Sequence, residues 1–279
     1  MKLPSRLAVL ALSVFVGVAA PETKPIETTR QMLDLTIVTN YPAKAKEFYG
    51  DIVGLKVLGS SGDTTRYQVG DGTINLVAAP KPLQAYPGFE GGIGISGVAL
   101  YLSDPDRFAN RMHDHGKPEP NFLMGKGGSK LTRLTDPDGN WIELVFLANS
   151  DAVGQMAIIL QVADEAKSRE FYGKTLGMPD APPHGKPETG LLYAYTAGRS
   201  TILIRGGRKG SPVHTGNPAN LAGYRSIRFP VKDVDALAAS LRESGVAIPV
   251  APHDGGPGGA RSMYVTDPDG NYLEFVSTQ

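Results

Sequence analysis

Two glutamates lie in short strand-like runs that are otherwise apolar. Glu143 lies in the run Trp141–Val145, and Glu274 lies in the run Tyr272–Val276. A carboxylate on such a strand loses much of its hydration, and it needs a cation, hydrogen-bond donors or a proton to offset that loss. Both glutamates are therefore candidates for binding a ligand or an ion, or for moving a proton.

The two glutamates end a repeated segment. Residues 135–143 read TDPDGNWIE, and residues 266–274 read TDPDGNYLE. A second pair of similar segments, Phe48–Leu55 and Phe171–Met178, lies upstream, and the two pairs have offsets of 131 and 123 positions. The Asp-Pro-Asp-Gly-Asn part is typical of a tight turn, since Pro presets φ, Asp caps the backbone and Gly adopts conformations that other residues resist. We infer that the chain contains two copies of one fold.

Each copy divides again into two halves with the same order of elements, a strand, a helix and further strands. The predicted strands are 32–38, 55–57, 65–69, 73–78, 97–102, 130–134, 141–146, 156–162, 192–197, 200–205, 226–231, 262–265 and 272–276. The predicted helices are 43–49, 105–115, 165–172 and 234–244. Asp104 is expected to cap the second helix, and Gly116 is expected to follow its end.

Four βαβββ modules, paired into two domains with curved mixed sheets, make an α+β fold. With the repeated Phe-Tyr-Gly and Asp-Pro-Asp-Gly-Asn motifs, the chain resembles the vicinal oxygen chelate superfamily of glyoxalases, bleomycin-resistance proteins and extradiol dioxygenases. The resemblance runs from about Met32 to Ser277 and gives two domains, residues 30–148 and 153–279. It implies that each domain closes a sheet around a cleft for a small molecule, often with a metal ion.

The resemblance also implies a role for Glu143 and Glu274. In metal-dependent relatives the residue at this place is a metal ligand, and the first strand of each module supplies the other ligands, usually histidines. The corresponding first-strand positions in this chain are Asp34, Ser96 or Gly97, Ala157 and Ser226. None of them is a histidine. The histidines are His113, His115, His184, His214 and His253, on a predicted helix or in loops.

We therefore expect no bound transition metal and no cofactor. Asp34 and Glu143 are the predicted catalytic pair, acting as acid and base or holding a hard divalent ion weakly. Ser96, Ser226 and Glu274 are predicted to line the ligand-binding cleft. In some relatives the modules of the two domains exchange partners, and Asp34 would then face Glu274. The sequence does not decide between these pairings.

The first twenty residues differ from the rest of the chain. Lys2 and Arg6 precede an apolar run, Leu7–Val18, which ends in small residues. This order predicts a signal peptide over residues 1–20, followed by a polar linker over residues 21–29, and export to the periplasm or the medium. The chain has no cysteine, which excludes disulfides and suits an oxidising compartment.

The balance of 28 basic and 28 acidic residues argues against nucleic acid as a partner, and after leader cleavage we expect no membrane association. The predicted function is binding of a small organic molecule in a sheet-lined cleft, with lyase or isomerase activity if the protein is an enzyme. One alternative is an extradiol-type dioxygenase with a divalent metal, for which the histidines are not in place. The other is a non-catalytic ligand-binding or interaction module. The ligand and the oligomeric state stay open.

Overall fold

The computed structural model describes residues 26–30, 32–85, 92–148, 150–186, 190–206, 221–256 and 259–277. The first sheet contains β1 (Asp34–Thr39), β2 (Val57–Ser61), β3 (Thr64–Val69), β4 (Gly72–Ala78), β14 (Leu221–Val231), β15 (Val250–His253), β16 (Ser262–Thr266) and β17 (Tyr272–Ser277). The second contains β6 (Gly94–Leu102), β7 (Leu123–Met124), β8 (Lys130–Thr135), β9 (Trp141–Phe146), β10 (Met156–Val162), β11 (Asp180–Lys186), β12 (Gly190–Ala197) and β13 (Ser200–Gly206). The described helices are α1 (Pro42–Lys46), α2 (Pro105–Asp114), α3 (Glu165–Arg169) and α4 (Val234–Glu243). These elements confirm the α+β fold of four βαβββ modules.

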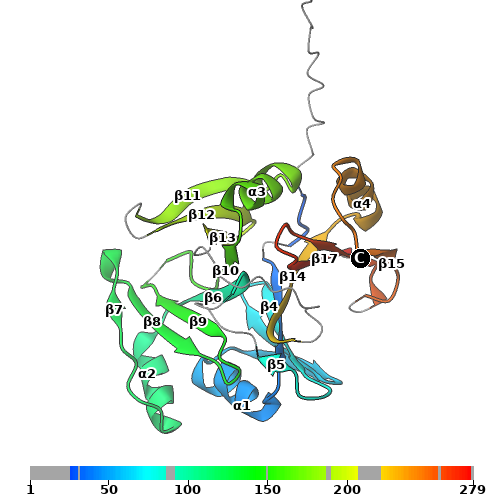
Figure 1. Cartoon of the computed structure of the whole chain (residues 1–279). Coiled ribbons are helices and arrows are strands. Elements are labelled where there is room, and N and C mark those ends of the chain that lie inside the picture. The colour runs from blue at the N-terminus through cyan, green and yellow to red at the C-terminus, as the bar shows by residue number, and fades with distance from the viewer. Residues whose placement is uncertain are drawn as a thin grey trace, which may run out of the picture.

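Each sheet takes one module from each sequence copy (Figure 1). The first sheet has the order β15-β16-β17-β14-β1-β4-β3-β2, and β1 and β14 pair antiparallel at its centre. The second has the order β11-β12-β13-β10-β6-β9-β8-β7, with β6 and β10 at its centre. The predicted ranges 30–148 and 153–279 therefore mark the sequence copies, and the sheets form across them. Exchange of modules, one of the two arrangements compatible with the sequence, is the arrangement in the structure.

One face of each sheet is apolar and belongs to the main core. In the first sheet Leu35, Ile74, Ile227 and Leu273 on four neighbouring strands are fully buried in that core. Burial of one such side chain contributes roughly 1.5–3 kcal/mol. Because side chains alternate along a strand, the residues next to these four along their strands, including Asp34, face the other side of the sheet.

The Phe-Tyr-Gly motif lies in a π turn that continues a short helix. The helix predicted over residues 43–49 is α1 followed by a π turn at Glu47–Ile52, and α3 continues into a π turn at Glu170–Thr175. The second turn needs its glycine, because a Cβ on Gly173 would lie 2.9 Å from the ring of Tyr195. The sequence pattern did not reveal the change of helix type.

The capping of α2 is confirmed. The carboxylate of Asp104 accepts a hydrogen bond from the backbone N–H of Arg107 at 2.8 Å. Gly116 follows the helix with a φ of 62°, a conformation that favours glycine. Asp233 caps α4 in the same way, through the N–H of Ala236. Both helices end one residue before the predicted ends.

The repeated turn links the two sheets within each sequence copy. The hydroxyl of Tyr49, from the module of the first sheet, donates to Asp136, from the module of the second sheet, at 2.8 Å. Asp136 also accepts from the backbone N–H groups of Asp138 and Asn140. In the second copy, Tyr172 donates to Asp267 at 2.8 Å. The aspartate of the turn therefore also holds the two sheets together within each sequence copy.

The short strands at the sheet edges were not predicted. These are β7, β11, β15 and the two-residue β5 (Gln84–Ala85), which pairs with β14 beside the main path. They lack an alternating pattern, and β11 contains two prolines, which edge strands tolerate.

The described end of the predicted linker contacts the folded part of the chain. Thr28 forms a β-bridge with Val231, and the N–H of Ile26 donates to the carbonyl of Leu176. Among the described residues, no helix has the length and apolar character needed to cross a membrane. The predicted signal peptide, residues 1–20, lies outside the described residues.

Candidate functional site

A row of polar side chains crosses the first sheet on the face opposite the core. The strand registers place Asp34 beside Arg228, Arg228 beside Glu274, and Glu274 beside Tyr264. The side chains of Asp34 and Glu274 are only 4% and 3% exposed. At this burial, each carboxylate depends on the partners that surround it.

Two arginines pair with these carboxylates. Arg30 Nη2 lies 2.6 Å from Asp34 Oδ2, and Arg228 Nε lies 2.7 Å from Glu274 Oε2. Arg228 also reaches Asp34, with 3.9 Å between Nη1 and Oδ2. Burial, followed by the charge of Glu274 and a hydrogen bond to it, raises the pKa of Tyr264 to about 12. Tyr264 is therefore a phenol that donates a hydrogen bond at neutral pH. We call Asp34, Arg228, Glu274 and Tyr264 the charged row.

The neighbouring row contains a buried amide. Thr36 pairs with Asn75 on one side and Ser226 on the other. Asn75 is 4% exposed, and its Oδ1 accepts a hydrogen bond from the hydroxyl of Thr73 at 3.3 Å. Within the described part of the chain, its Nδ2 has no hydrogen-bond partner. A buried donor without an acceptor costs about 1–3 kcal/mol, so this amide is suited to bind a ligand oxygen.

In the second sheet, the positions equivalent to the charged row carry different side chains. Glu143 pairs in register with Ala99, as Glu274 does with Arg228, and Ala157 lies next to Ala99. The two alanines belong to a small buried cluster with Ile159, Ala194 and Leu203. Among the described residues, the cation that forms an ion pair with Glu143 is Arg133, at 3.1 Å, and its side chain is 53% exposed. The centre of this face is apolar, and two polar pairs lie around it: Gln161 with Arg205, joined by a hydrogen bond of 2.8 Å, and Glu143 with Arg133.

The structure brings together three of the five predicted site residues. Asp34, Ser226 and Glu274 share one face of the first sheet, whereas Glu143 lies on β9 of the second. The predicted pair of Asp34 with Glu143 therefore does not form, because the modules exchange between copies. The alternative pairing, Asp34 with Glu274, forms through Arg228. The hydroxyl of Ser96 donates to the carbonyl of Ile159 at 3.2 Å, which is a structural role between β6 and β10.

The histidines lie elsewhere. His115 Nδ1 lies 3.0 Å from Glu47 Oε1 on the helix side, His253 contacts Ser262 at 3.4 Å, and His113 is exposed. His184 belongs to β11, and His214 lies outside the described residues. No group of three His, Asp or Glu side chains arranged to hold a metal occurs among the residues that the structure describes.

The oxygen donors on this face of the first sheet do not suit an iron or zinc centre. Asp34, Ser226 and Glu274 offer oxygen atoms only, whereas such centres use imidazole or thiolate together with carboxylate. Both carboxylates are already paired with guanidinium groups, and Arg228 would place a positive charge beside the ion. The chemistry that fits this arrangement is recognition of polar organic groups.

Arg228 and Asn75 were not among the site residues predicted from the sequence. Arg228 lies two residues after Ser226 on one strand, so strand alternation alone places it on the same face. Asn75 in the first module is equivalent to Glu274 in the fourth module. Each is paired in register with the first strand of its own module, Asn75 with Thr36 and Glu274 with Arg228. A search for polar residues at the module-equivalent positions, beyond carboxylates and histidines, would have found both.

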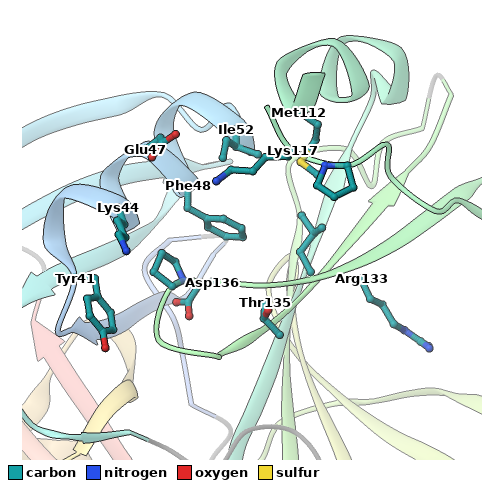
Figure 2. Close-up of a pocket in the computed structure, with 13 residues that line it drawn as sticks. Tyr41, Lys44, Glu47, Phe48, Ile52, Met112, Lys117, Arg133, Thr135 and Asp136 are labelled. Atoms are coloured by element: carbon teal, nitrogen blue, oxygen red, sulfur yellow. The ribbon is translucent and has the colours of Figure 1, made fainter. Parts of the chain in front are cut away.

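A separate pocket lies on the helix side of the second sheet. Its volume is about 750 Å³, and it is lined by residues of α1, the π turn after it, the segment after α2, and β8 (Figure 2). Phe48, Ile52, Met112 and Leu134 supply apolar surface, and Asp136 of the repeated turn also lines it. Figure 2 shows the side chain of Arg133 pointing away from the other lining residues. The pocket does not include the charged row.

Four βαβββ modules, joined in pairs into two sheets with one polar or mixed face each, define a protein of the paired βαβββ class. The chain belongs to the Glyoxalase/Bleomycin resistance protein/Dioxygenase superfamily, whose family model matches residues 31–144 and 153–275. The two matched segments coincide with the two sequence copies.

Similar proteins agree with this assignment. The chain is 30% identical over 124 residues to the uncharacterized protein YraH of Bacillus subtilis (strain 168), which covers 43% of this chain and 94% of YraH. The crystal structure of glyoxalase I from Zea mays aligns with a TM-score of 0.68 and 20% identity, over 88% of this chain and 92% of that one. A Bacillus subtilis structure provisionally assigned as a dioxygenase aligns with a TM-score of 0.62 and 13% identity, over 92% of this chain and 86% of that one. At these identities the structural matches establish the fold.

Proposed function

We propose that the protein binds a small organic molecule on the face of the first sheet that carries the charged row. The supporting observation is the buried Nδ2 of Asn75, which has no acceptor within the described residues. Asn75 shares its face of the sheet with Arg228, and β1 lies between their two strands. A carbonyl or carboxylate oxygen of the ligand would accept this hydrogen bond, and the guanidinium of Arg228 would hold the same group from the other side.

The charges near Asn75 favour a neutral or singly anionic ligand. The charges of Arg30 and Arg228 balance those of Asp34 and Glu274, so the charged row together with Arg30 has no net charge. Arg66 pairs in register with Asn75 and is exposed, which adds one positive charge at the edge of this face. A molecule with one carbonyl or one carboxylate fits this balance, whereas a divalent metal ion would oppose it.

In the enzymatic form of this proposal the protein is a lyase or an isomerase. Asp34 or Glu274 would accept a proton from the carbon next to the ligand carbonyl and return it at a later step. Asn75 and Arg228 would stabilise the negative charge that develops on the carbonyl oxygen. The face lacks the two histidines of an extradiol-type dioxygenase, so that alternative has no supporting observation. A non-catalytic binding protein would use the same residues without the proton transfer.

Asn75→Leu is expected to weaken binding at least tenfold for small carbonyl or carboxylate compounds found by a thermal-shift screen of the mature protein. The reason is the loss of one buried hydrogen bond to the ligand, worth about 1.5 kcal/mol. Leucine is the residue at the equivalent position of the second sheet, Leu203. Isothermal titration of wild type and variant measures the change. If a hit is turned over, Glu274→Gln should lower kcat by about a hundredfold or more.

Glu143→Gln is the matched control on the other sheet, and it should leave both affinity and turnover within twofold of wild type. The opposite result, binding that survives Asn75→Leu but fails with Glu143→Gln, would place the ligand on the second sheet and overturn the proposal.

We also propose that the protein is exported. The support is the order of basic, apolar and small residues over positions 1–20. Protein recovered from the native host should begin near Ala20 or Pro21 when its N-terminus is sequenced. An intact Met1 on soluble protein from the cytosol would contradict export.

A further inference from the structure

The pocket on the helix side of the second sheet has the dimensions and lining of a second ligand site. Its volume of about 750 Å³ lies within the usual range for small-molecule pockets. Phe48, Ile52 and Met112 are at most 8% exposed and belong to the main core, so the apolar part of the lining is fixed by packing. The pocket is independent of the charged row and of the function proposed for it.

The two carboxylates that line this pocket have partners, whereas among the described residues its two lysines have no carboxylate partner. Glu47 lies 3.0 Å from His115, and Asp136 accepts hydrogen bonds from Tyr49 and Asn140. By contrast, Lys44 and Lys117 also line the pocket, and within the described residues neither has a carboxylate at ion-pair distance. Lys44 Nζ lies 5.7 Å from the ring centroid of Tyr41, which also lines the pocket.

The second sequence copy lacks these two features. Lys117 follows α2 as Val246 follows α4: the N–H of Lys117 donates to Met112, and the N–H of Val246 donates to Leu241. Val246 is apolar and packs against the core. The lysine at the place of Lys44 in the second copy is Lys167, which lies 3.7 Å from Asp164. The duplicated scaffold therefore carries two available cations at this junction in the first copy only.

We propose that this pocket binds a small amphipathic organic anion, an aromatic or aliphatic body with one carboxylate, sulfonate or phosphate group. The body would lie on Phe48, Ile52 and Met112, and the anionic group would lie between Lys44 and Lys117. Burial of the apolar body supplies most of the affinity, and the two ammonium groups select for the anion.

Titration with 8-anilinonaphthalene-1-sulfonate, an amphipathic anion that fluoresces in apolar surroundings, tests this site. The double variant Lys44→Gln/Lys117→Gln should bind the probe three- to tenfold more weakly than wild type, since each exposed ion contact is modest. The uncharged analogue N-phenyl-1-naphthylamine should bind both proteins equally. Lys167→Gln is the matched control and should behave as wild type. Equal affinity of wild type and the double variant for the sulfonate would overturn the proposal.

The position of the probe is checked by NMR of methyl-labelled methionine. The Met112 signal, assigned through Met112→Leu, should shift on saturation with the sulfonate. Met263, which is buried in the second copy, should not shift. A shifted Met263 signal with an unchanged Met112 signal would place the probe elsewhere and overturn the assignment. Because Arg228 and Asn75 are not in this pocket, Asn75→Leu should leave the titration unchanged, which separates this site from the charged row.

Discussion

Arg228→Met is expected to lower the free energy of unfolding by about 3–5 kcal/mol at neutral pH, because it leaves Glu274 buried without its cation. Asp34 keeps Arg30 as a partner, so Glu274 carries most of the loss. For a chain of this size the melting temperature should fall by about 10 °C. Thermal unfolding followed by circular dichroism measures the change.

Two further variants make this prediction specific. Arg133→Met removes the cation next to Glu143 in the second sheet, where the pair is exposed, and it should change stability by less than about 1 kcal/mol. Glu274→Gln added to Arg228→Met should restore most of the lost stability. Equal destabilisation by the two arginine substitutions, or no recovery in the double variant, would show that the charged row does not hold these carboxylates as the structure indicates.

Asp267 is expected to make the protein less stable as the pH rises from 4 to 7. Burial raises the pKa of Asp267 to about 6, and its hydrogen bonds from Asn271 and Tyr172 oppose this only in part. The folded state therefore holds a proton in a range where the unfolded chain, with its ordinary aspartate pKa, has lost it. Stability from this group is complete below about pH 4 and falls as the pH rises through 6, by about 3 kcal/mol.

Chemical denaturation at several pH values measures this slope. Asp267→Asn should flatten the profile between pH 4 and 7, whatever its effect on stability at a single pH. Asp136→Asn in the first copy should change the profile in the same direction, since burial also raises the pKa of Asp136. Asp63→Asn, at an exposed position, should leave the slope unchanged. A profile for Asp267→Asn with the wild-type slope would contradict the raised pKa.

Much of the fold could be predicted from local pattern. Strand alternation and the duplicated motifs predicted the four modules, and the strand 141–146 coincides with β9. The Asp-Pro-Asp-Gly-Asn turn also indicated its own geometry, because each residue type in it has a local conformational reason. The short edge strands escaped prediction because two to seven residues at a sheet edge have no burial pattern to detect.

The pairing of modules could not be predicted in this way. Asp34 and Arg228 are 194 positions apart. The first strand of each module is the strand that pairs with another module, and its sequence is compatible with a partner in either copy. Local pattern carries no information on which partner is chosen, and the candidate site depends on that choice. It places Asp34 with Glu274, and it leaves Glu143 between Ala99 and Arg133. The two sheets share one scaffold and differ on the faces opposite the core: the first carries the charged row, and the second carries an apolar cluster around Ala99 and Ala157.

The most direct test of the central claim is a crystal structure of the mature protein with a carbonyl or carboxylate compound from the thermal-shift screen. We expect the compound on the first sheet, with an oxygen within hydrogen-bond distance of Asn75 Nδ2 and the same group in contact with Arg228. Density for the compound beside Glu143 on the second sheet, or a metal ion held by Asp34, Ser226 and Glu274 in place of the arginine pairs, would contradict the account.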